Sequence, residues 1–142
     1  MEKSEEKYRR FFEQNPAAIT VADKDGKFVD VNEEFAKLTG YTKEEIVGRP
    51  LSKFVAEKDR QRVIEYNRRR MEGKEVPSHY EYKLLRKDGE IRDVEVKIIK
   101  LPDDKTLACR IDITEKKKWR KSLKNLRRCL EPWLKNLWLA YI

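Results

Sequence analysis

Apolar and polar residues alternate most regularly between residues 78 and 113. Tyr80 and Tyr82 alternate with charged neighbours, and Val94 and Val96 do the same after a short break. This period of two is typical of strands with one buried face. Gly89 ends a Lys-Asp-Gly turn between the two runs, which favours a hairpin. The pattern predicts three consecutive antiparallel strands, over residues 78–86, 90–101 and 106–113.

Upstream of residue 78, helical patterns surround one further hairpin. Asn32 and Gly40 have the residue types that begin and end a short helix, and Thr42 and Glu45 have the form of a capping box. We expect strands over 17–22 and 27–31 and helices over 4–14, 33–39, 42–47 and 57–72. The last helix is predicted to have an inner side formed by Val63, Ile64, Tyr66, Asn67 and Met71.

The last segment, residues 115–142, has a heptad-like spacing of large apolar residues. The spacing is typical of a coiled-coil helix. Pro132 is expected to kink or break this helix, because proline removes a backbone hydrogen bond. Three interpretations remain open: a dimer helix, a helix that folds back onto a sheet, and an amphipathic helix on an anionic membrane. The residues that share the spacing are Trp119, Leu123, Leu126, Leu130, Trp133 and Leu137.

The net charge of +8 is unevenly distributed. Residues 115–142 hold nine of the 34 Lys and Arg residues and two of the 26 Asp and Glu residues, a net +7, which leaves +1 for residues 1–114. Nucleic-acid binding by the domain itself therefore loses its main support. A basic-tailed adaptor that binds an anionic membrane surface or nucleic acid remains the alternative function.

The composition favours a single intracellular domain. A chain of 142 residues is long enough to bury a core without disulfides, and its two cysteines lie far apart in sequence. No apolar run is long enough to span a membrane. We therefore expect a cytoplasmic protein.

Several short motifs in this order of elements resemble those of the PAS family of sensory modules. The resemblance spans roughly residues 4–118 and predicts three parts: an N-terminal flanking helix over 1–15, a sensory domain over 16–114 and an output or dimerisation helix over 115–142. The motifs are Asn15-Pro16-Ala17-Ala18-Ile19, the segments 25–35 and 38–49, Arg86-Lys87-Asp88-Gly89, and Asp112-Ile113-Thr114-Glu115.

The resemblance implies an α+β fold in which helices cover one face of a five-stranded antiparallel sheet, with the first hairpin beside the last strand. It also implies a sensor in signal transduction, for example in a histidine kinase of a two-component system. Asp112 and Thr114 match the junction between the last strand and the output helix. Thr114 is expected to cap that helix and Asp112 to pair with a base, so that both relay a signal.

The space between the helices and the sheet is the candidate ligand cleft. A closed apolar core is the competing interpretation, and the residue types favour it. Tyr80 and Tyr82 favour a ligand or water, since buried phenols need hydrogen-bond partners. The expected lining is Phe35, Ile46, Phe54, Tyr66, Tyr80, Tyr82, Val94, Val96 and Cys109.

The resemblance also makes specific cofactors testable. The branch that forms a covalent flavin adduct needs a cysteine in the helical region, and residues 32–72 contain none. The haem branch takes a histidine from the helix over 57–72, and His79 is the only histidine of the chain. The sequence thus disfavours both groups and a metal site, and leaves a non-covalent flavin or small molecule open. No arrangement of a nucleophile and a base is visible, so we expect a regulatory domain without catalysis.

Association with a second copy is the remaining prediction. PAS modules often dimerise through flanking helices, so a homodimer is expected, with an output domain of the parent protein as a further partner. The candidate interface residues are Tyr8, Phe11 and Phe12 of the first helix, together with the six residues of the tail spacing.

Overall fold

The computed structural model describes the backbone of residues 2–141 and the side chains of residues 5–132. It divides into two compact units, Met1–Asp112 and Ile113–Ile142. The division falls two residues before the boundary expected after Thr114.

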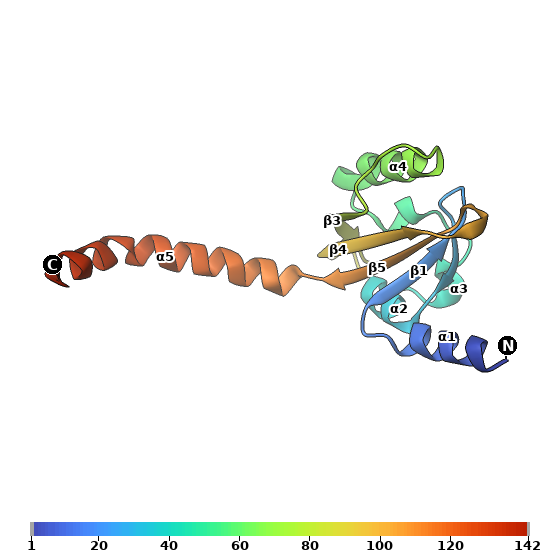
Figure 1. The fold of residues 1–142 in the computed structure, drawn as a ribbon, viewed down its shortest axis with the longest axis horizontal. Helices are drawn as coiled ribbons and strands as arrows, with labels where there is room; N and C mark the ends of the chain where they lie inside the picture. Colours follow the sequence, from blue (N-terminus) through green and yellow to red (C-terminus); the bar gives the residue numbers. More distant parts are fainter. Residues whose placement is uncertain (1, 142) are drawn as a thin grey trace. The chain divides into compact units, whose positions relative to one another are not determined.

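The first unit is built on one five-stranded antiparallel sheet (Figure 1). The strand order is β2-β1-β5-β4-β3, so the first hairpin lies beside the last strand, and the predicted fold class is confirmed. The β1–β2 turn contains Asp25-Gly26 and the β3–β4 turn contains the predicted Asp88-Gly89, whereas the connection from β4 to β5 contains no glycine. The strands are β1 (Ala18–Ala22), β2 (Phe28–Val31), β3 (His79–Leu85), β4 (Ile91–Lys100) and β5 (Thr106–Asp112).

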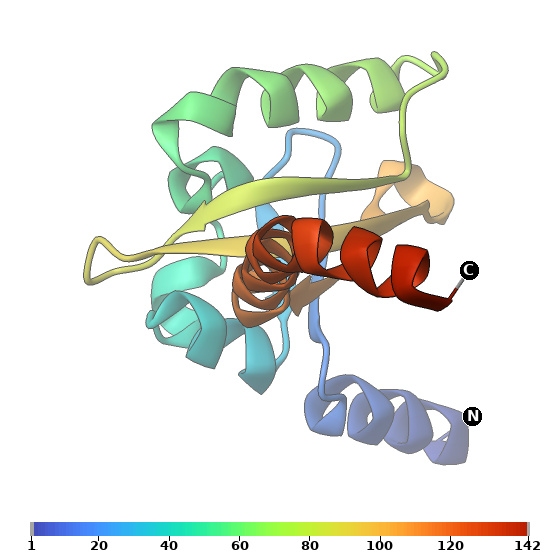
Figure 2. The same ribbon diagram turned by 90° about the vertical axis from the view of Figure 1, so that its left-hand side faces the viewer.

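Helices lie on both sides of this sheet. Figures 1 and 2 show α4 and α1 on opposite sides of it. The larger core packs Phe35, Ile46, Phe54 and Val63 of the helical segments against one sheet face. These segments are α2 (Glu33–Thr39), α3 (Lys43–Ile46), the 3-10 turn η1 (Leu51–Phe54) and α4 (Glu57–Met71), while η2 (Pro102–Asp104) joins β4 and β5.

The helix α1 (Glu2–Gln14) forms a second, smaller core on the opposite sheet face. Phe12 is 2% exposed and packs there with Ile19 and Val21. The prediction that Phe12 contributes to a dimer interface is therefore wrong, because its ring is buried within its own chain. Tyr8 and Phe11, by contrast, are 50% and 66% exposed.

Asn32 joins the two sides of the first unit. Its side chain is fully buried and makes four hydrogen bonds to backbone groups. Oδ1 accepts from the N–H groups of Ile19 and Phe35, and Nδ2 donates to the carbonyls of Phe12 and Ala17, at 2.9–3.1 Å. The residue that caps α2, as predicted, thus also fixes β1 and the end of α1.

The second unit consists of the helix α5 (Thr114–Tyr141). The helix continues through Pro132, so the expected break is not observed, and Figure 2 shows its axis changing direction toward the C-terminal end. Thr114 is the first residue of the helix, and the Lys117 N–H donates to the Ile113 carbonyl at 2.8 Å in its first turn. Trp119, Leu123, Leu126 and Leu130 are all exposed, whereas the side chains of Trp133 and Leu137 lie outside the described residues.

Candidate ligand-binding site

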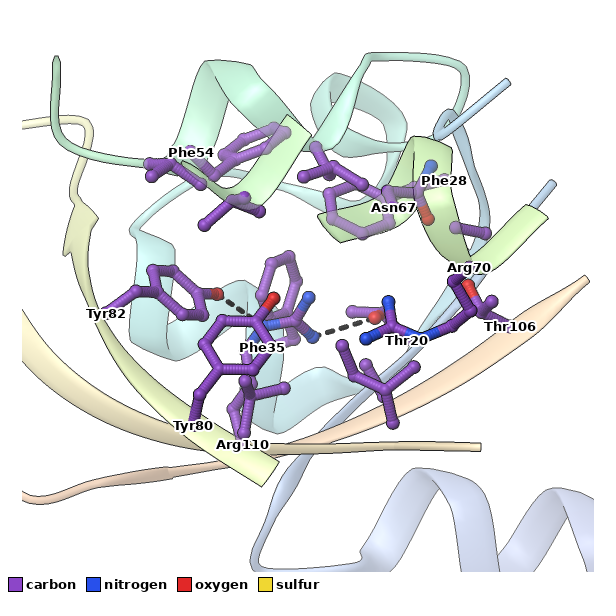
Figure 3. Close-up of a pocket in the computed structure, with 17 residues that line it drawn as sticks. Thr20, Phe28, Phe35, Phe54, Asn67, Arg70, Tyr80, Tyr82, Thr106 and Arg110 are labelled. Carbon is purple, nitrogen blue, oxygen red and sulfur yellow. Dashed lines mark hydrogen bonds between the residues drawn. The ribbon is translucent and has the colours of Figure 1, made fainter. Parts of the chain in front are cut away.

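A small cavity lies between α4 and the sheet (Figure 3). The centres of water-sized molecules can occupy about 30 Å³ of it, and one water needs roughly 10–15 Å³ by this measure. The cavity thus has the size of a small functional group, and a flavin would fit only if α4 or the lining side chains moved. Its aromatic wall is Phe28, Phe35, Phe54, Tyr80 and Tyr82, and its polar wall is Thr20, Asn67, Arg70, Thr106 and Arg110.

The Arg110 side chain crosses the floor of the cavity. Arg110 is 6% exposed and points from β5 toward the helices. Its Nε donates to the Tyr82 hydroxyl at 2.6 Å, and its Nη1 donates to Thr20 Oγ1 at 2.7 Å. The guanidinium carbon lies 4.9 Å from the ring centre of Phe35 and 5.8 Å from that of Phe28, within the range of cation–π attraction.

Arg70 approaches the cavity from the opposite side. It lies on α4 one turn after Asn67 and is 8% exposed. Its Nη2 donates to the Pro77 carbonyl at 2.7 Å, and burial lowers the pKa of its guanidinium. Figure 3 shows the side chains of Arg70 and Arg110 directed into the same space.

Tyr80 completes the polar part of the wall. Its ring packs edge-on against Tyr66 with 5.0 Å between ring centres. Burial, followed by the neighbouring Tyr82, raises the pKa of Tyr80 to about 12. The phenol is therefore neutral at physiological pH.

The structure brings together five of the nine predicted cleft residues. Phe35, Phe54, Tyr80, Tyr82 and Val96 line the cavity.

The other four lie elsewhere. Ile46 and Val94 are fully buried in the packed core, and Tyr66 reaches the site only through its contact with Tyr80. Cys109 lies on the opposite sheet face in the smaller core, so its assignment to the cleft is wrong. Burial, the larger effect, raises the pKa of the Cys109 thiol.

The two arginines of the site were not predicted from the sequence. On the last strand Cys109 was assigned to the cleft, yet Thr106, Ala108 and Arg110 face the cavity. On α4 the predicted inner side included Ile64, which is exposed, and did not include Arg70. A helical spacing of three and four residues through Val63, Asn67 and Arg70 was the available indication.

The expected junction residues lie near the end of β5. The Asp112 carboxylate accepts from Arg92 Nε at 2.8 Å, which is the predicted pairing of Asp112 with a basic residue. Arg92 also pairs with Glu90 at 2.9 Å. These contacts raise the pKa of the Arg92 guanidinium, chiefly through the bond to Asp112. His79 is half exposed and pairs with Glu95 on the neighbouring strand.

Comparison with known proteins identifies the family. The model of the PAS fold matches residues 6–108. The PAS domain of an HTR-like protein from Haloarcula marismortui is 30% identical, with a TM-score of 0.66, over 79% of this chain and 93% of that chain. The chain therefore belongs to the PAS family.

Other solved structures show the same fold. A domain of a sensory box sensor histidine kinase/response regulator from Geobacter sulfurreducens is 25% identical, with a TM-score of 0.68, over 77% of this chain and 94% of that chain. The Rhodobacter sphaeroides LOV protein is 22% identical, with a TM-score of 0.64, over 80% of this chain and 68% of that chain, and this likeness concerns the fold alone. A search of curated proteins found no match. Over the residues that the structure describes, no helix is both long and apolar enough to cross a membrane.

Proposed function

We propose that this PAS chain is a sensory module of a signal-transduction protein such as a histidine kinase, without catalysis of its own. A small molecule in the cavity is the signal, and its presence changes the start of α5. Two findings support the proposal: membership of the PAS family and the likeness to the 25% identical domain of a sensor histidine kinase/response regulator.

The observation that carries this proposal is the position of Arg110 on β5. Residues two apart on a strand point to the same face, so Arg110 in the cavity and Asp112 at the strand end share a face. The helix α5 begins two residues further on, at Thr114. A displacement of Arg110 by a ligand would therefore act on the strand segment from which the output helix starts.

Asp112 is the first residue proposed to relay the signal, through its ion pair with Arg92. Their ion pair joins β5 to β4 at the end of the sheet. Because this pair holds the end of β5, a shift of β5 would change the backbone conformation of the residues that follow Asp112. Thr114 is one of these residues and is the second residue proposed to relay the signal.

Dimerisation through exposed apolar residues is the second part of the proposal. Trp119, Leu123, Leu126 and Leu130 repeat at the spacing of a coiled-coil seam, and all four side chains are exposed. Tyr8 and Phe11 offer a further exposed surface on α1. A second copy of the chain is the proposed occupant of the α5 surface.

Native mass spectrometry of the freshly purified protein, with a denaturing run beside it, tests both parts. The expected result is a dimer with additional mass that disappears on denaturation. A dimer without additional mass would leave association as the function and contradict the ligand. A bare monomer would contradict the dimer, and binding to anionic lipid vesicles would then support the basic-tailed adaptor.

A further inference from the structure

We propose that the cavity binds a small carboxylate anion, held between the guanidinium groups of Arg110 and Arg70. The inference rests on the proposed function, because it names the chemical class of ligand for the same site. It follows from three properties of the cavity: its charge, its unused hydrogen-bond donors and its size.

The wall of the cavity has a positive charge without a counter-charge. Both arginines are more than nine-tenths buried, and a guanidinium stays protonated at any physiological pH. None of the described residues that line the cavity is Asp or Glu. The partners of the two arginines are two hydroxyls and a carbonyl, which do not neutralise them. A buried cation without an anion is unfavourable, so an anionic ligand would supply what the protein lacks.

The same two groups retain donors that can bind an anion. Arg110 uses Nε and Nη1 for Tyr82 and Thr20, and among the described residues no acceptor satisfies its Nη2. Arg70 uses Nη2 for the Pro77 carbonyl, which leaves other N–H groups of its planar guanidinium available. The N–H groups of two guanidiniums can donate to the two oxygens of a carboxylate, and such charge-assisted hydrogen bonds are stronger than neutral ones.

The dimensions of the cavity limit the ligand to a few atoms. Its volume of about 30 Å³ for the centres of water-sized molecules suits a carboxylate group with a short carbon chain. Phe28 and Phe35 lie against the Arg110 guanidinium and provide an apolar surface for that chain. Acetate is therefore the simplest probe, and chloride at equal ionic strength is the control for a salt effect.

The wild-type test is an NMR titration of the arginine side-chain Nε–Hε signals with sodium acetate. The resonances of Arg110 and Arg70 are expected to shift and saturate with acetate and to stay in place with chloride. This readout requires no variant, so it remains valid if a cavity variant fails to fold.

Calorimetric titration of variants tests the role of each arginine. Arg110→Met and Arg70→Met are each expected to weaken acetate binding roughly tenfold or more, because each removes charge-assisted hydrogen bonds. Arg69→Met is the matched control, since Arg69 is the exposed neighbour on the same helix. Acetate binding by Arg69→Met should equal that of the wild type.

The other outcomes separate this inference from the proposed function. Acetate binding that survives in both cavity variants would place the ion elsewhere and overturn the inference. Binding of inorganic phosphate but not acetate, with the same arginine dependence, would show the carboxylate class to be wrong. If acetate does not bind but native mass spectrometry finds a neutral ligand, the inference fails while the ligand-sensing function stands. If neither is found, both fail.

Discussion

The Nε of Arg110 on β5 donates a 2.6 Å hydrogen bond to the Tyr82 hydroxyl on β3, across the intervening strand β4. On the other side the same guanidinium bonds Thr20 on β1 at 2.7 Å. One buried side chain therefore connects strands that are not neighbours in the sheet. A group bound to Arg110 would therefore affect three of the five strands, β1, β3 and β5, at once.

Tyr82→Phe is expected to destabilise the fold by about 1–2 kcal/mol, because it leaves a buried, charged N–H donor without an acceptor. Urea unfolding followed by circular dichroism measures the change. Tyr66→Phe is the control, since Tyr66 is only partly buried and its ring contact with Tyr80 is retained. Equal effects of the two substitutions would contradict the assigned role of the Tyr82 hydroxyl.

Asn32→Ala is expected to cost more, roughly 3 kcal/mol or above, because four buried backbone groups lose their partner together. The same urea experiment applies, with attention to whether the variant folds at all. Asn15→Ala provides the comparison, since Asn15 bonds only the nearby Ala17 N–H and should change stability by about 1 kcal/mol or less. A loss of stability for Asn32→Ala no larger than that for Asn15→Ala would contradict the role of Asn32 in joining the two sides of the unit.

The raised pKa of Tyr80 predicts a stability change at alkaline pH. The folded state holds the phenol proton until about pH 12, whereas the ordinary pKa of a tyrosine is 10.0. The stabilisation is therefore fully present below pH 10 and is lost as the pH rises toward 12. Absorbance of tyrosinate at alkaline pH should reveal a group that titrates near pH 12, and Tyr80→Phe should remove it. A late group that persists in this variant would assign the shift to another tyrosine.

Phe12 and Phe11 are expected to respond in opposite ways, although they are neighbours on α1. Phe12→Ala should cost about 3–5 kcal/mol because it opens a cavity in the smaller core. Phe11→Ala should leave unfolding within about 0.5 kcal/mol of the wild type, because its ring is exposed. Parallel urea unfolding of both variants decides the point, and a large loss for Phe11→Ala would count against the orientation of α1.

The sequence predicted where the strands lie more accurately than which face of each strand is directed toward the cavity. Alternation and turn residues indicated every strand, because an Asp-Gly turn and a period of two are local properties. On β5 the alternation separated Cys109 from Arg110 correctly but did not indicate which face points inward. Both faces of β5 carry side chains that contact helices or the cavity, so apolar residues occur on both.

Arg70 and Arg110 were missed for a related reason. Charged residues are almost always assigned to the surface, since a buried charge needs compensation. Here two hydroxyls, a carbonyl and aromatic rings provide part of it, and they come from distant segments of the chain. Long-range compensation of this kind has no local pattern in the sequence.

Hydrogen exchange of the Lys117 amide tests the central claim, that the cavity and the start of α5 are coupled through β5. This amide donates to the Ile113 carbonyl in the first turn of the helix. Arg110→Met should change its exchange rate severalfold, and Ile111→Thr, an exposed substitution on the same strand, should leave the rate unchanged. If Arg110→Met folds normally and its Lys117 amide exchanges at the wild-type rate, the cavity and the start of α5 are not coupled and the proposed relay is contradicted.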